Sequence, residues 1–151
     1  MVRIAAVIVF AVATAMAAAA QPAPVDVLFQ QFGLFGVWAP DCQQAAAPAN
    51  PHVSITTPGP GLVLEEHDLG PDYAINHYRL VSAERLTDEQ LSVVVVFQSG
   101  TEAEERQKLV FLVRKGTRRT MFNQADGGEV RVKDGIVLAF DRETPVLNKC
   151  E

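Results

Sequence analysis

The sequence predicts an all-β domain, an antiparallel meander of about eight to nine strands that follows a short helical turn. From position 52 onward, runs rich in Val, Ile, Leu, Phe and Tyr alternate with Gly, Pro or Asp. No helical pattern separates these runs, so the crossover helix that parallel strands require is missing. A small closed or nearly closed barrel suits a chain of 151 residues. A β-sandwich is the alternative architecture.

The first 20 residues have the pattern of a secretory signal peptide. Arg3 precedes an apolar run over residues 4–15, in which Thr14 is the one polar residue, and alanines fill positions 17–20. The small residues predict cleavage before Gln21, with a shift of a residue or two allowed by the alanine run. A retained membrane anchor is the competing interpretation, but a bilayer needs about 20 apolar residues. We therefore expect a periplasmic or secreted protein with no membrane span after cleavage.

Residues 21–33 are predicted to form an extended leader and a short helix. Over 25–32, the apolar side chains of Val25, Leu28, Phe29 and Phe32 share one side. Glycines at 33 and 36 end the helix, and residues 34–38 open the first strand of a β domain that spans 34–151. Residues 43–51 are predicted as a loop. Further strands are predicted at 52–56, 62–67, 73–83, 91–98, 106–114, 117–123, 129–132 and 136–140.

The connections between these strands carry turn residues. Asp134-Gly135 is a preferred type I′ pair, which predicts a tight hairpin there. Both faces of the strands at 91–98 and 106–114 carry aliphatic side chains. These two strands are therefore expected to be buried on both sides or to lie in a closed barrel.

The two cysteines of the chain, Cys42 and Cys150, lie near the two ends of the mature protein. Export to an oxidising compartment favours a disulfide between them. Such a bond closes a loop of about 108 residues, for which chain entropy gives roughly 4 to 5 kcal/mol of stabilisation. A redox-active pair is the alternative, but there is no C-x-x-C spacing to lower a thiol pKa.

A G-x-W segment, Gly36 to Trp38, follows the helical turn. In this respect the chain resembles the calycin group, the lipocalins and their barrel relatives. The resemblance implies a lipocalin-like barrel whose Trp packs at the closed end under an Arg from a late strand, either Arg131 or Arg142. Small bacterial metalloprotease inhibitors share a similar barrel, which leaves a protease-inhibitor function as an alternative. Their disulfide closes a short local loop, unlike the predicted bond here.

The segment W-A-P-D-C at 38–42, together with Asn50-Pro51-His52 and the late Cys150, is similar to a set of small exported bacterial proteins of unknown function. That resemblance implies a disulfide scaffold and supplies no activity. Asp41 is expected to pin its turn through its carboxylate.

The motifs of common catalytic sites are missing from the sequence. There is no G-x-S-x-G, no S-x-x-K and no phosphate-binding G-x-x-x-x-G-K. We therefore predict no catalytic residue, no enzyme activity and no cofactor. His67 with Glu65, Glu66, Asp68 and His77 could gather around a hairpin and hold a cation. Because no H-x-H or H-E-x-x-H spacing is present, solvated surface residues are the preferred interpretation and no metal site is predicted.

Charge gives a candidate interaction site. The chain has 13 Lys+Arg against 18 Asp+Glu, a net charge of -5, which disfavours a nucleic-acid partner. Arg114, Lys115, Arg118 and Arg119 are nevertheless predicted to gather at a hairpin end, as a patch for an anionic lipid, polyanion or acidic protein. The preferred interpretation is that these arginines pair with acids of neighbouring strands. Trp38 is a further candidate contact residue, or simply a core aromatic beside the disulfide.

Two function classes follow from this fold. One is a binding module that holds a small apolar or amphipathic ligand in the barrel mouth, with residues 91–113 as walls. The other is a non-catalytic interaction or scaffold module that acts through its surface. Four phenylalanines, at 97, 111, 122 and 140, would fill the barrel if all faced inward. That expectation favours the interaction module.

Overall fold

The computed structural model describes residues 23–150, and the predicted signal peptide at 1–20 lies outside the described residues. One helix, α1 (Val25–Gln31), precedes the strands. These are β1 (Gly36–Ala39), β2 (His52–Gly59), β3 (Leu62–Asp68), β4 (Asn76–Arg85), β5 (Gln90–Phe97), β6 (Glu105–Arg114), β7 (Thr117–Ala125), β8 (Val130–Lys133), β9 (Ile136–Val137), β10 (Arg142–Glu143) and β11 (Leu147–Cys150). No helix within the described range is long and apolar enough to cross a membrane.

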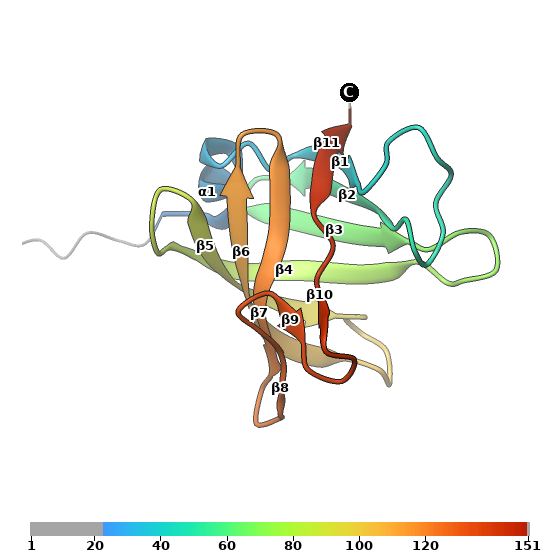
Figure 1. Cartoon of the computed structure of the whole chain (residues 1–151). Helices are drawn as coiled ribbons and strands as arrows, with labels where there is room; N and C mark the ends of the chain where they lie inside the picture. The colour runs from blue at the N-terminus through green and yellow to red at the C-terminus, as the bar shows by residue number, and fades with distance from the viewer. Residues whose placement is uncertain (1–22, 151) are drawn as a thin grey trace, which may run out of the picture.

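Eight strands close into an antiparallel barrel in the order β1-β2-β3-β4-β5-β6-β7-β11. The last strand joins the two edges, because β11 pairs with β7 on one side and with β1 on the other. β8, β9 and β10 form an excursion from β7 that lies apart from α1 (Figure 1). The predicted barrel is therefore confirmed, and the sandwich alternative is wrong.

The end of the chain differs from the prediction. The strand expected at 136–140 stops at Val137, and Phe140 lies in a turn in which its amide donates to the Val137 carbonyl at 3.1 Å. The sequence does not predict β10 or β11. The second of these, β11 (Leu147–Cys150), holds a single aliphatic side chain. Its extended form comes from hydrogen bonds on both sides, which a local pattern does not reveal.

The predicted helix is confirmed, and it covers one end of the barrel. Val25, Leu28 and Phe29 on α1 are buried against the barrel core, whereas Gly33 (φ +65°) turns the chain towards β1. The interior at this end is packed with large apolar side chains, among them Leu34, Trp38, Ile55, Val63, Leu91 and Val93. The helix thus plugs this end of the barrel.

Trp38 lies in this packed end. Its indole nitrogen donates to the Leu34 carbonyl at 2.8 Å, and Lys149 places its ammonium 5.5 Å from the ring centre. The expectation of an Arg over this Trp is wrong for both candidates, because Arg131 pairs with Glu105 on β6 and Arg142 lies exposed on β10. Since Trp38 is only 1% exposed, it is a core residue and no contact site.

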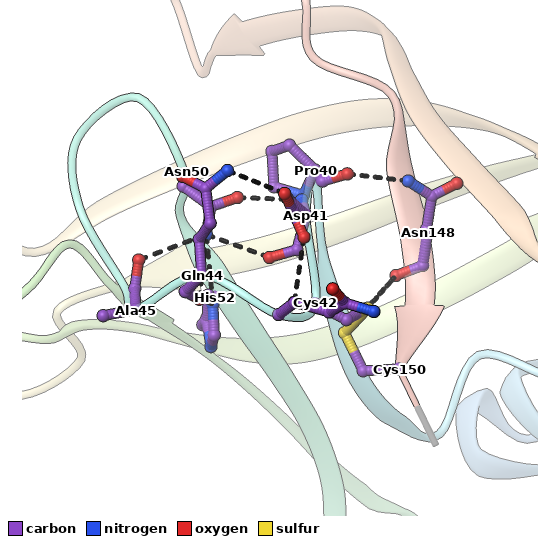
Figure 2. The surroundings of a disulfide bond; sticks show 10 residues. Pro40, Asp41, Cys42, Gln44, Ala45, Asn50, His52, Asn148 and Cys150 are labelled. Carbon is purple, nitrogen blue, oxygen red and sulfur yellow. Dashed lines mark hydrogen bonds between the residues drawn. A yellow bond between two sulfur atoms is a disulfide. The ribbon is translucent and has the colours of Figure 1, made fainter.

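The predicted disulfide is confirmed. Cys42 and Cys150 are bonded with their Cα atoms 5.5 Å apart. Next to the bond, the Asn148 side-chain amide donates to the Pro40 carbonyl at 2.7 Å (Figure 2). The segment that follows β1 is therefore tied to the closing strand β11 by one covalent bond and one hydrogen bond.

The loop after Cys42 is organised around Asn50. Its amide nitrogen donates to the carbonyls of Asp41, Gln44 and Ala45, and its oxygen accepts the Asp41 amide at 2.9 Å (Figure 2). The Asp41 carboxylate accepts the Gln43 amide at 2.9 Å, which confirms the predicted pinned turn. The type I′ turn is also confirmed, since Asp134 and Gly135 both have positive φ.

We expect the double variant Cys42→Ser/Cys150→Ser to lose about 2–4 kcal/mol of unfolding free energy, because the bond restrains a long loop in the unfolded chain. Urea denaturation followed by Trp38 fluorescence measures this loss. Wild-type protein under reductant serves as the control and should match the variant. A variant as stable as the oxidised wild type would show that the hydrogen bonds of β11 suffice.

Candidate functional site

A buried ion pair crosses the barrel interior. Glu65 on β3 and Arg118 on β7 come from opposite sides of the ring, since three strands separate them in either direction. Arg118 donates to the two carboxylate oxygens at 3.0 and 2.8 Å, and the side chains are only 3% and 6% exposed. The guanidinium carbon also lies 4.4 Å from the centre of the Phe111 ring. The pair therefore spans the lumen.

The environment of Glu65 keeps its carboxylate ionised. Burial raises the pKa of Glu65. The charge of Arg118 and the hydrogen bond from His67 together lower it by more, so the net pKa lies well below its usual value. His67 Nε2 lies 2.6 Å from Glu65 Oε1. Because an ionised carboxylate only accepts hydrogen bonds, His67 must carry its proton on Nε2.

The interior is packed on one side of this ion pair and hollow on the other. On the side away from α1 lies a cavity of about 240 Å³, with Glu65, Arg118 and Phe111 among its lining residues. Much of its wall is apolar, with Val53, Val95, Leu109, Val132, Pro145 and Leu147. Polar side chains also line it, namely His67, Tyr78, Thr120, Asn123 and Thr144. An apolar cavity of roughly 150 Å³ already binds benzene, so this one has room for a small organic molecule.

The cavity exists because the four phenylalanines do not all face inward. Phe111 is buried at 2% exposure, and Phe97 is half-buried with its ring 5.1 Å from that of Tyr78. Phe140 is 74% exposed in the turn after β9, and Phe122 is on the outer face of β7. The expectation of a filled barrel is wrong for these last two residues.

A β-bulge explains the position of Phe122. Thr120 pairs with Phe111 and Phe122 pairs with Val110, so Met121 is an extra residue in β7. Before the bulge, Thr120 faces inward. After it, the inward positions are Asn123 and Ala125. The bulge therefore places an amide in the cavity wall where strict alternation predicts an aromatic ring.

A chain of hydrogen bonds runs from β8 to this amide. Arg131 binds both oxygens of Glu105 at 2.6 Å, and Gln107 Nε2 donates to the same carboxylate at 2.6 Å. The hydrogen bond from Arg131 lowers the pKa of Glu105. Asn123 Nδ2 donates to Gln107 Oε1 at 2.9 Å. Within residues 23–150, Asn123 Oδ1 is buried and has no hydrogen-bond partner.

The four predicted patch residues do not lie together. Arg118 is inside the barrel, so its assignment to a surface patch is wrong: alternation along β7 turns it inward. Arg114 and Arg119 each pair with a glutamate, at 3.1 and 3.2 Å. Lys115 is exposed in the turn between β6 and β7. The preferred interpretation, in which the arginines pair with neighbouring acids, is right for Arg114 and Arg119.

The acid and histidine cluster is divided between two faces of β3. Glu65 and His67 point inward, which the surface interpretation missed, whereas Glu66 pairs with His77 at 3.0 Å on the outer face. Asp68 accepts the Gly70 amide at 2.8 Å. Alternation from the apolar Val63 is the signal that places residues 65 and 67 inside. Within the described range, no group of three or more His, Cys, Asp or Glu could hold a metal ion.

Comparison with known proteins assigns this chain to no family. No protein-family model, curated protein sequence or solved structure matches this chain. The resemblances to calycin barrels and to exported proteins with a W-A-x-D-C segment therefore stay predictions.

We expect Arg118→Met to lower the unfolding free energy by about 3–5 kcal/mol, because Glu65 is then left as a buried charge without its partner. The double variant Glu65→Leu/Arg118→Met removes both charges and should be much less destabilised. Urea denaturation at pH 7 gives the values. If the single and double variants lose the same stability, the ion pair is not coupled across the lumen.

The same measurement against pH tests the charge state of Glu65. Because its folded-state pKa is lowered, the stabilisation is fully present above the pKa of the unfolded chain, ordinarily 4.5, and is lost as the pH falls towards the folded pKa. Below pH 4.5 the wild type should lose stability more steeply than the double variant, by up to about 1.4 kcal/mol per pH unit. Equal slopes would contradict this assignment.

Proposed function

We propose that this protein is a non-catalytic binding module that holds a small, largely apolar molecule inside its barrel. The cavity beside the Glu65–Arg118 pair is the observation that supports the proposal. The sequence favours a surface interaction module only if side chains fill the barrel. The cavity removes that reason. The helix α1 packs into the other end of the barrel, so we place the ligand entrance at the end away from α1. A ligand pocket at the mouth of a small barrel is a common arrangement in proteins.

The chemistry of the cavity favours a neutral ligand. Glu65 and Arg118 neutralise each other, so the interior presents no unbalanced charge to a bound molecule. Burial and then the charge of Glu65 raise the pKa of Tyr78 to about 12, which keeps its phenol protonated. Apolar walls contribute roughly 25 cal/mol for each Å² of ligand surface that they cover. A compact ring system or a short chain fits these properties.

The ion pair also argues against acid–base catalysis in the cavity. A general base works best when its pKa lies near the working pH, and the pKa of Glu65 lies far below that range. Both oxygens of Glu65 are occupied by Arg118, and His67 shares one of them. We therefore assign Glu65, Arg118 and His67 a structural role in the floor of the site.

The β8–β10 excursion contributes one side of the proposed site. It supplies Val132 to the wall, and Thr144 follows directly after β10. Arg119 fastens this segment, since its Nε donates to Thr144 Oγ1 at 3.1 Å and its Nη2 to the Gly135 carbonyl at 2.8 Å. We assign Arg119 this positioning role in place of a contact to an anionic partner. The disulfide is compatible with the predicted periplasmic or secreted location, where such a module would meet its ligand.

We expect Leu109→Trp to weaken the binding of a neutral bicyclic probe, because the larger ring occupies the cavity. The probe is benzothiophene, and a ligand-observed NMR titration gives its affinity. Val110→Trp is the matched control, since the adjacent residue faces outward on the same strand and should bind as the wild type does. At least a tenfold loss is expected for Leu109→Trp.

Thermal melting confirms that both variants fold before they are compared. Two results would contradict the proposal: benzothiophene that does not bind the wild type, or one that binds Leu109→Trp as tightly as the wild type.

A further inference from the structure

Three aromatic rings lie side by side on the inner face of neighbouring strands. Tyr78 on β4 pairs with Glu65 on β3, so its side chain points into the barrel as that of Glu65 does. The centre of its ring lies 4.7 Å from that of His67 on β3 and 5.1 Å from that of Phe97 on β5. Both distances are in the range that aromatic pairs prefer. The ring of Tyr78 is therefore held between two others, which fixes the direction of its hydroxyl.

The hydroxyl of Tyr78 opens onto the cavity. Tyr78 is one of the lining residues and is half-buried. Burial and then the charge of Glu65 raise the pKa of its phenol, so the oxygen lies inside the barrel and close enough to the floor for that charge to act on it. Within residues 23–150 this oxygen has no hydrogen-bond partner, and it is not among the buried unpaired atoms as Asn123 Oδ1 is. It is therefore both unpaired and accessible.

Several other donors of the cavity wall are already in use. The Arg118 guanidinium and the Nε2–H group of His67 donate to Glu65. The Thr144 hydroxyl donates to a carbonyl of β7 at 2.7 Å. The phenol of Tyr78 stays protonated at neutral pH and presents an O–H donor to a bound molecule.

We propose that the ligand is a neutral, planar ring compound with a hydrogen-bond acceptor that binds the Tyr78 hydroxyl. This inference rests on the proposed function and specifies its ligand class. Heteroaromatic rings with an unprotonated ring nitrogen, and aromatic ketones or esters, meet the requirement. The row of rings at 67, 78 and 97 favours a planar molecule, which can pack against it by edge or face. A bare hydrocarbon fills the cavity but leaves the hydroxyl without a partner, which costs affinity.

The test compares benzothiophene with benzothiazole, which has nearly the same shape and replaces one ring CH group by a nitrogen acceptor. We measure the ratio of their dissociation constants by NMR titration in the wild type and in Tyr78→Phe, which removes only the hydroxyl. The matched control is Tyr73→Phe, because the other tyrosine of the chain is 53% exposed in the loop before β4. The wild type and the control should share one preference for benzothiazole. That preference should fall about fivefold in Tyr78→Phe, the usual effect of losing one hydrogen bond between neutral groups.

A second measurement uses the wild type and keeps the test decisive if Tyr78→Phe does not fold. Protein labelled with ¹³C at the tyrosine Cζ gives one NMR signal for each of its two tyrosines, and Tyr73→Phe assigns them. Saturation with benzothiazole should move the Tyr78 signal further than saturation with benzothiophene does, because only benzothiazole accepts strongly from the hydroxyl. The Tyr73 signal should stay in place with both probes.

The outcomes separate the inference from the proposed function. An equal preference in the wild type and in folded Tyr78→Phe, or the same Tyr78 shift with both probes, overturns the inference and leaves the proposed function intact. If neither probe binds the wild type, the proposed function fails, and the inference fails with it.

Discussion

The cross-barrel pair of Glu65 and Arg118 is the constraint on which the rest of the interior depends. It joins opposite sides of the ring and lies between a fully packed half and a hollow half. Burying two charges is costly, and it is tolerated here because the contact is bidentate and because His67 and Phe111 surround it. Because the pair spans the lumen beside the cavity, it forms the floor of that cavity.

The C-terminal segment links closure of the barrel to construction of the site. β11 joins the two edges of the sheet, and the residues that lead into it, Thr144 and Pro145, belong to the cavity wall. The disulfide ties the end of β11 to the segment after β1. Barrel closure and the shape of the cavity therefore depend on the same stretch of chain, and loosening one is expected to disturb the other.

Much of the barrel could be predicted because strands and tight turns have local signals. Asp134-Gly135 needs positive φ at two residues, and the sequence supplies residues that tolerate it. The site could not be predicted in the same way. Glu65 and Arg118 lie 53 positions apart, and only closure of the ring brings them together. One inserted residue in β7 places Asn123, and not Phe122, in the cavity wall. No local sequence pattern predicts this insertion. β11 is extended because it pairs with the neighbouring strands β1 and β7.

A crystal structure of the protein grown with benzothiophene tests the account most directly. We predict electron density for the ring inside the barrel, on the floor formed by Glu65 and Arg118 and against the apolar wall that includes Leu109. The ion pair should be unchanged. A barrel whose side chains collapse into the cavity, or benzothiophene bound only on the outer surface, would contradict it.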